Sequence, residues 1–331
     1  MSAAVASEAV LSELTATLRA AVHRTGGPDG CACATADSVL ADRPDVTVVR
    51  HGNTVAKAHA PGTDPAALAR RTAVAAHPAL RDILLPPLRP GPVLLHDRPV
   101  TLWPHGDPVD PEDRDAAPWE DMAGLLAALH RTDPAALGCG QLPPMGGPAR
   151  AARAVARLAA LAPRHPVAAS VRAAWDALPG WARGERPMER GELCHGDVHL
   201  GQLVRPVGGG WRLIDVDDLG LGDPAWDLAR PAAWYACGLL DASEWTRFLA
   251  AYRLAGGTAV PPQGDPWPVL DVPARAVTVQ SAALALVKST RAGRELDEAE
   301  RCVVDACARI VGLDAGPGAG TAEGGGDGGA E

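Results

Sequence analysis

Two aspartates in the second half of the chain are each bordered by a short apolar segment of strand-like composition. Asp197 is followed by the side-chain amide of Gln202, and Asp215 stands directly behind Leu213 and Ile214. Phosphoryl transfer needs one carboxylate to orient the acceptor hydroxyl, and an amide oxygen with a second carboxylate to hold Mg²⁺ against the phosphates. The fold must therefore bring two strand-flanked loops together, and the pattern predicts a Mg²⁺-dependent phosphoryl-transfer site.

The residues around these aspartates form an ordered set that resembles one known family. The chain reads His-Gly-Asp at 195–197, Gly-Gln at 201–202, Ile-Asp at 214–215 and Gly-Asp-Pro-Ala-Trp-Asp-Leu-Ala at 222–229. This order resembles the aminoglycoside phosphotransferase family of small-molecule kinases, which share the protein-kinase architecture. The resemblance implies an α+β, bilobal protein-kinase-like fold, with a β-rich N-terminal lobe and a mainly helical C-terminal lobe.

The same resemblance implies a role for each matching residue. It makes Asp197 the catalytic base that orients the acceptor hydroxyl, Asp215 the principal Mg²⁺ ligand and Gln202 the second metal ligand. Asp227 is expected to cap a helix and to brace the catalytic loop rather than to contact the substrate. His195 and His199 are expected to be buried structural histidines that orient this loop.

Lys57 is the candidate phosphate-binding residue of the N-terminal part. It and Lys288 are the only lysines among 31 basic residues, and such a bias toward arginine favours a lysine where a compact ammonium is hard to replace. Lys57 lies in the second strand of a predicted hairpin, which resembles the kinase strand whose lysine contacts the α- and β-phosphates. A solvent-facing strand lysine is the alternative, and Lys288 is expected on the surface.

The chain changes from strand-like to helical texture along its length. Apolar runs at 46–49 and 54–56 flank the turn sequence Arg-His-Gly-Asn, which predicts the hairpin. We expect a nucleotide-binding lobe over 1–104, a helical catalytic and acceptor-binding lobe over 105–313, and a Gly-rich disordered tail over 314–331. The other elements expected are a helix through Leu11, Leu14, Leu18 and Val22, helices over 65–76, 119–130, within 148–178 and from 223 to about 311, strands over 93–95 and 100–103, short strands within 191–216, and an irregular connection over 104–118.

Three positions depart from the family pattern. The helix after Lys57 offers no Glu to hold the lysine; Thr72 stands about where it would fall, and Asp64 is the nearest acidic candidate. Gln202 replaces the usual Asn, as in some maltokinase-like members that share His-Leu-Gly-Gln. No Gly-x-Gly-x-x-Gly loop precedes the hairpin, so we expect residues 34–38 to cover the phosphates instead.

The segment from Thr101 to Gly106 falls where the resemblance places the hinge between lobes. The backbone of such a hinge pairs with the purine edge. Trp103 is then a candidate to pack near the adenine of ATP, although an ordinary core tryptophan explains it equally well.

The composition excludes several classes of function. A net charge of −9 argues against nucleic-acid binding and suits a cationic substrate. Asp217 and Asp218 are expected to form part of a solvated acidic loop. The seven cysteines are scattered without zinc spacing, which is typical of reduced thiols in the cytoplasm. We expect no membrane segment and no signal peptide.

These observations favour an ATP-dependent kinase that phosphorylates a hydroxyl of a small polar molecule, with an aminoglycoside or amino sugar as the preferred acceptor. Mg²⁺ is the expected cofactor, ATP the co-substrate, and GTP the alternative donor. The open alternatives are a maltokinase-like neutral-sugar kinase, an amino-alcohol kinase and a non-catalytic pseudokinase. A protein kinase is disfavoured, because His-Arg-Asp, Asp-Phe-Gly and Ala-Pro-Glu are all missing from the sequence.

Overall fold

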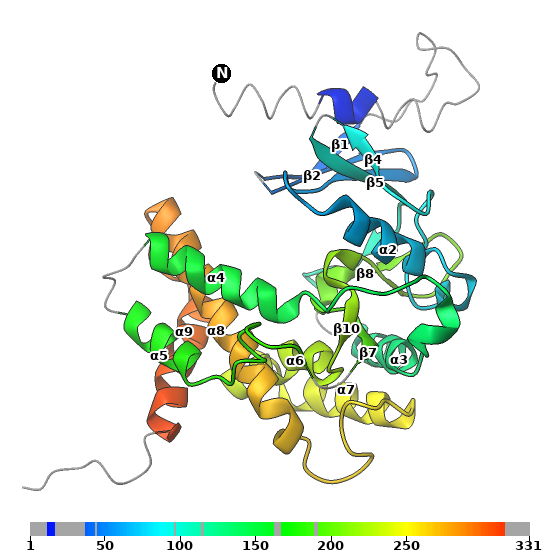
Figure 1. Cartoon of the computed structure of the whole chain (residues 1–331). Helices are drawn as coiled ribbons and strands as arrows, with labels where there is room; N and C mark the ends of the chain where they lie inside the picture. Colours follow the sequence, from blue (N-terminus) through cyan, green and yellow to red (C-terminus); the bar gives the residue numbers. More distant parts are fainter. Residues whose placement is uncertain are drawn as a thin grey trace, which may run out of the picture. The chain divides into compact units, whose positions relative to one another are not determined.

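The computed structural model describes residues 12–16, 37–43, 45–95, 97–113, 116–161, 167–188 and 191–314 (Figure 1). These residues fall into two compact units. The first comprises residues up to Gly147, Pro187–Ala232 and Asp241–Leu270, and the second comprises Pro148–Arg186, Ala233–Leu240 and the chain from Asp271 onward. The predicted lobe boundary at residue 104 stays a prediction. The predicted tail beyond residue 314 and residues 34–36 of the predicted phosphate cover lie outside the described residues.

A five-stranded antiparallel sheet forms the N-terminal part of the first unit, in the order β1-β2-β3-β5-β4. The predicted hairpin is confirmed, because His51 pairs with Thr54 across a two-residue turn in which Gly52 has φ +56°, a value that favours glycine. The strands are β1 (Ser38–Arg43), β2 (Val46–His51), β3 (Thr54–Ala58), β4 (Val93–Leu95) and β5 (Arg98–Pro104).

The pairing of β3 with β5 gives this sheet two different faces. Lys57 lies opposite Thr101 and Val55 opposite Trp103, so these four side chains share one face. The alternate residues form a buried apolar cluster on the other face, which includes Leu14 from the helical residues 12–16. The predicted N-terminal helix is thus confirmed as far as it is described. The cluster consists of Leu14, Val49, Ala56, Ala58, Val100 and Leu102.

Short strands frame the two loops that carry the predicted catalytic residues. One loop joins β7 (Glu192–Cys194) to β8 (Leu203–Arg205), and the other joins β9 (Arg212–Leu213) to β10 (Gly220–Gly222). Because β7 pairs with β10 and β8 pairs with β9, the two loops emerge side by side from paired strands. The fold therefore places the residues after 194 next to those after 213.

One strand lies in a segment that the sequence predicts to be irregular. β6 (Asp107–Pro108) pairs with β8 within the connection 104–118. Its partner residues are Val204 and Arg205, about a hundred positions later. The local sequence carries no sign of this pairing, since the hydrogen-bonding partner comes only from the tertiary fold.

The predicted helices of the first unit are confirmed. Asp64 caps α2 (Pro65–Ala75) by accepting a hydrogen bond from the Ala66 N–H at 2.9 Å. α3 (Trp119–His130) packs against α7 (Ala242–Leu254), where the Trp119 ring meets Phe248 edge-on with centroids 6.1 Å apart. α6 (Ala225–Cys237) begins in this unit and carries two side chains of the site.

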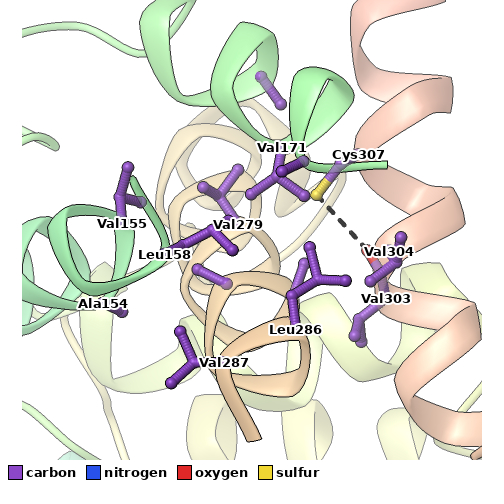
Figure 2. Close-up of a cluster of buried hydrophobic side chains, with 14 residues drawn as sticks. Ala154, Val155, Leu158, Val171, Val279, Leu286, Val287, Val303, Val304 and Cys307 are labelled. Carbon is purple, nitrogen blue, oxygen red and sulfur yellow. Dashed lines mark hydrogen bonds between the residues drawn. The ribbon is translucent and has the colours of Figure 1, made fainter. Parts of the chain in front are cut away.

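The second unit is a helical assembly with an apolar core. Its side chains come from α4 (Gly147–Leu161), α5 (Ala168–Asp176), α8 (Trp267–Ala292) and α9 (Glu298–Asp314). The first residue of α4 and the first four residues of α8 belong to the first unit. Figure 2 shows aliphatic side chains of these helices gathered in one cluster, with Cys307 at one side, where its thiol lies 3.5 Å from the Val303 carbonyl oxygen. Burial raises the pKa of this thiol to about 12, so it stays protonated at neutral pH.

α8 is a long and apolar helix. Its length and composition would allow it to cross a membrane, with a mean hydropathy of 1.3 over its most apolar window. However, 67% of that window is buried inside the protein, and the core helices of soluble proteins share this character. Its residues Val279, Leu286 and Val287 belong to the core shown in Figure 2. We therefore interpret α8 as a core helix.

Candidate active site

A fully buried carboxylate holds the backbone of the loop that carries Asp197. Asp227, in the first turn of α6, accepts hydrogen bonds from the backbone N–H of His195 at 2.6 Å and of Gly196 at 2.7 Å. Gly196 has φ +88°, and a Cβ there would lie 2.6 Å from the Asp218 carbonyl oxygen, so only glycine fits. The predicted bracing role of Asp227 is confirmed, but its predicted capping role is wrong. Asp223 caps α6 instead, by accepting from the Ala225 N–H.

Two further buried side chains hold Asp227 in place. The Ala259 N–H donates to the Tyr252 hydroxyl at 3.0 Å, which leaves the Tyr252 hydrogen for His130 Nδ1 at 2.7 Å. His130 Nε2–H then donates to Asp227 at 3.0 Å. Burial raises the pKa of Tyr252 well above its ordinary value.

His130, Cys194 and Asp227 lie close enough together to suggest a metal site, with ligand atoms within 4.8 Å of one another. Asp227 already accepts two backbone hydrogen bonds and one from His130, and the second nitrogen of His130 is bonded to Tyr252. We therefore interpret the cluster as a structural brace.

His195 ties the two catalytic loops together. Its Nε2 lies 2.7 Å from the carbonyl oxygen of Ile214, and because a carbonyl only accepts, this nitrogen carries the hydrogen. Its Nδ1 then accepts from the backbone N–H of Asp197 at 3.4 Å. The predicted structural role of His195 is confirmed, and Asp197 is linked through it to the residue that precedes Asp215.

The Asp197 carboxylate is 8% exposed and is held by a cation that sequence reasoning missed. Arg230 donates from Nη2 to Asp197 Oδ1 at 2.9 Å and from Nε to the Val198 carbonyl oxygen at 3.1 Å. Arg230 follows Asp227 by three residues on α6, so both project from one face of the helix. The spacing could have revealed Arg230 from the sequence, because a helix that braces the loop through Asp227 also presents the residue three positions later to the same loop.

His199 is only partly buried, so the prediction of a buried histidine is wrong for this residue. Burial, together with the Arg230 cation, lowers its pKa to about 4, although Asp197 and Asp215 act in the opposite direction. It is therefore uncharged at neutral pH.

Asp215 stands in an unusual backbone conformation. Its φ of 62° and ψ of 68° are left-handed, and it is the one non-glycine residue with positive φ in the described part of the chain. Aspartate tolerates this region better than most residues, and such conformations gather at functional sites. The conformation turns the carboxylate toward Lys57, whose Nζ lies 2.6 Å from Asp215 Oδ1.

Gln202 is attached directly to the Asp215 loop. The backbone carbonyl oxygen of Gln202 accepts from the Ile214 N–H at 2.9 Å, and its backbone N–H donates to the His199 carbonyl oxygen at 2.8 Å. Its side chain is 7% exposed. The structure thus brings together Asp197, Gln202, Asp215 and Lys57 in the first unit, while the role predicted for each stays a prediction.

Lys57 is not a solvent-facing strand lysine. Its side chain is 13% exposed and contacts two carboxylates, Asp215 at 2.6 Å and Asp217 at 2.9 Å. Burial alone would lower the pKa of Lys57, but these two anions raise it above its ordinary value. Burial likewise opposes the Asp217 charge, yet Lys57 and His59 hold the Asp217 pKa well below its usual range.

Two expectations about the acidic residues are corrected here. Asp218 is only 6% exposed, and the Asp217 side chain, although 33% exposed, is bound by Lys57 and by His59, whose Nδ1 lies 3.1 Å away, so the two do not form a freely solvated loop. The groups that contact Asp217 lie on β3 and directly after it, which the local acidic run does not reveal. Asp64, the nearest acidic candidate for Lys57, caps α2 instead.

Comparison with known proteins identifies the family. Residues 41–267 match the model of the phosphotransferase enzyme family known as APH. The chain belongs to this family. The resemblance read from the motifs is confirmed, and the protein is a small-molecule phosphotransferase.

Solved structures of related fold agree with this assignment. A choline/ethanolamine kinase family protein from Mesorhizobium loti is 18% identical, with a TM-score of 0.52 over 93% of this chain and 96% of that one. The apo form of a thermostable mutant of aminoglycoside phosphotransferase APH(4)-Ia is also 18% identical, with a TM-score of 0.55 over 85% and 96%. The likeness confirms the α+β kinase-like fold. The comparison with curated protein sequences found no match.

A phosphotransferase of this family is expected to use Mg²⁺, and the donor set fits that ion. Asp215 offers carboxylate oxygens, and the largely buried residue Gln202 offers an amide oxygen; both are the hard ligands that Mg²⁺ prefers. The backbone hydrogen bond between Ile214 and Gln202 joins the two chain segments that carry these side chains. These are the residues that would hold the ion.

Trp103 lies on the same face of the sheet as Lys57. It is 9% exposed, and its Nε1–H donates to Thr101 Oγ1 at 2.8 Å. The indole is thus fixed on the face that carries the phosphate-binding candidate. Contact with adenine stays a prediction.

Proposed function

We propose that this phosphotransferase transfers the γ-phosphate of ATP, with Mg²⁺, to a hydroxyl of a small cationic acceptor, an aminoglycoside or related amino sugar. The observation that carries the proposal is the 2.6 Å contact between the buried Lys57 ammonium and Asp215, on a loop that His195 joins to Asp197. These are the phosphate-binding, metal-binding and acceptor-orienting groups that phosphoryl transfer requires.

In this proposal each residue of the chain has a separate task. Lys57 contacts the phosphate oxygens, and Asp197 accepts the hydrogen bond of the acceptor hydroxyl and takes its proton as the phosphoryl group moves. Arg230 fixes the Asp197 carboxylate through its 2.9 Å contact, so one oxygen keeps a set orientation. Mg²⁺, when bound by Asp215 and Gln202, neutralises the developing charge on the phosphates.

The choice of a cationic acceptor rests on charge. The chain has a net charge of −9, and an acidic field favours a positively charged ligand. Structures of similar fold include a mutant of APH(4)-Ia in a ternary complex with AMP-PNP and hygromycin B, at 19% identity with a TM-score of 0.53 over 86% of this chain and 94% of that one.

One rival acceptor has a specific observation behind it. The sequence His199-Leu200-Gly201-Gln202 is shared with maltokinase-like members, which act on neutral sugars. Phosphotransfer to maltose or glucose by this chain would favour that rival.

The five cysteines in the described part are free thiols, which supports a reducing compartment such as the cytoplasm.

A phosphotransfer screen with ATP or GTP and Mg²⁺ tests the proposal. Aminoglycosides, amino sugars, amino alcohols and neutral sugars are offered at equal concentration, with Asp197→Asn as the inactive control. We expect turnover with the amino-sugar class. Turnover with none of these acceptors, despite measurable nucleotide binding, would favour a pseudokinase and contradict the proposal.

Salt dependence of the acceptor KM tests the charge argument separately. Added KCl screens exposed charges over a Debye length of about 8 Å at physiological ionic strength. A polycationic acceptor should then show a rising KM with nearly constant kcat. An amino-sugar KM that does not respond to KCl would remove the electrostatic support for this acceptor class.

A further inference from the structure

In the family pattern, the helix after the strand lysine supplies a carboxylate that holds this lysine. In this chain that helix is α2, and it supplies none. In α2 the buried Thr72 hydroxyl lies within hydrogen-bond distance of three carbonyl oxygens, those of Leu68, Ala69 and Pro90. Arg71 of the same helix donates instead to the Leu219 carbonyl oxygen at 2.8 Å. The contact of α2 with the loop after Asp215 is therefore made by a cation, and the lysine must be held by another group.

Asp217 is the group in position to hold Lys57. The ammonium contacts Asp215 and Asp217 together, but Asp215 is the carboxylate assigned to the metal. A carboxylate that coordinates a divalent cation has less negative charge to offer a neighbouring ammonium. Asp217 is then the carboxylate that keeps Lys57 aimed at the phosphates.

A directional chain of hydrogen bonds fixes Asp217. Ionised carboxylates only accept, so His59 Nδ1 carries the hydrogen that bridges 3.1 Å to Asp217. His59 Nε2 lies 2.8 Å from the Thr101 hydroxyl oxygen. Thr101 in turn accepts from Trp103 Nε1–H, which is a donor only. His59, Thr101 and Trp103 are buried, Asp217 is about one-third exposed, and each polar group of the series has a partner.

Strand pairing places the sheet residues of this series on one face. Lys57 and His59 are two residues apart along β3 and its extension, and Thr101 and Trp103 are two residues apart on β5. The pairing of Lys57 with Thr101 sets the two strands in register. His59 and Thr101 are each 2% exposed, so neither is available to solvent.

We propose that Asp217 replaces the missing helix glutamate as the positioning residue of Lys57, and that His59 and Thr101 hold it there. The inference rests on the proposed function for its catalytic consequence, but the contacts themselves can be tested without turnover. It assigns a task to three residues that no sequence motif marks.

Selective labelling of lysine amines tests the contacts directly. Since Lys57 and Lys288 are the only lysines, mass spectrometry after mild acetylation reports Lys57 against Lys288 as an internal reference. In the nucleotide-free protein, Asp217→Asn should raise the relative labelling of Lys57 several-fold, and Thr101→Val should raise it less. Unchanged Lys57 labelling in Asp217→Asn would overturn the inference, whether or not the protein proves to be a kinase.

Matched controls separate this series from a general effect on the sheet. Thr47 and His51 are each 2% exposed, like Thr101 and His59, but lie on β2, where His51 contacts Asp37 at 2.8 Å. Thr47→Val and His51→Gln should leave the relative labelling of Lys57 unchanged. Equal effects of Thr47→Val and Thr101→Val would show a loss of sheet stability and contradict the proposal.

A double-mutant cycle on the active enzyme tests the catalytic consequence. We expect Asp217→Asn to lower kcat/KM for ATP by at least about tenfold, Asp217→Glu to recover part of it, and Thr101→Val to lower it about threefold. Because Thr101 acts through Asp217, Thr101→Val should cost almost nothing in the Asp217→Asn background. Additive losses would overturn the series, as would a loss in Asp217→Asn that excess Mg²⁺ fully restores, which would make Asp217 a metal ligand only. Failure of the wild type to bind ATP would instead contradict the proposed function.

Discussion

The interior of each compact unit is stabilised by a different kind of interaction. The first unit buries polar groups in a connected series, Asp227 with His130 and Tyr252, and it pairs the largely buried Lys57 with the partly exposed Asp217. The second unit packs Ala, Val and Leu side chains in one cluster that includes Cys307 (Figure 2). Buried polar groups depend on each partner, because an unsatisfied one is costly, whereas an aliphatic core mainly needs its volume filled. Substitutions in the buried polar series of the first unit should therefore cost more stability than volume-conserving substitutions in the core of the second unit.

The largest effect is expected where the polar series is most connected. Asp227→Ala leaves two backbone N–H groups and His130 without their acceptor, and breaking such a buried arrangement costs about 3–5 kcal/mol. Denaturant unfolding followed by circular dichroism measures it, and activity should be lost as well. A cost below about 1 kcal/mol would mean that water replaces Asp227 and that the two units do not differ as described.

Asp197→Asn separates function from stability within the same unit. The variant keeps the shape of the side chain but removes the base, so kcat should fall at least about 10²-fold. Folding and nucleotide binding should be retained, as measured by unfolding and by calorimetric titration of ATP. Near-normal turnover would remove Asp197 from the catalytic assignment.

The pH dependence of stability should identify His199 as a partly buried neutral group. Its folded pKa of about 4 lies below the ordinary 6.5, so the unfolded chain binds the proton first as the pH falls. Stability is therefore lost between about pH 6.5 and pH 4, by at most about 1.4 kcal/mol per pH unit from this one group. In His199→Gln this part of the slope should vanish; an identical pH profile of the two proteins would contradict it.

The smallest effect is expected in the aliphatic core. Leu286→Met keeps the volume of a fully buried side chain, so the cost should be below about 1.5 kcal/mol with kcat unchanged. Leu286→Ala is the matched cavity variant, for which about 2–5 kcal/mol is expected. If Leu286→Met proved as costly as Asp227→Ala, the contrast between the two units would fail.

The sequence by itself determined the family, the α+β class and the position of most elements. The motif residues from His195 to Ala229 lie close together along the chain, and the hairpin around Gly52 follows from local turn chemistry. Such features depend on neighbours a few positions away. That is why Asp197, Gln202, Asp215 and Lys57 could be chosen before the fold was known.

Only the tertiary structure decided which groups those residues contact. Lys57 and Asp215 are 158 positions apart, as are His59 and Asp217, and β6 pairs with a strand about a hundred residues later. The local acidic run therefore predicted a solvated loop, while the folded chain turns Asp217 toward a buried ammonium. The physical reason is that electrostatic pairing depends on distance in space, and chain separation in sequence leaves that distance undetermined.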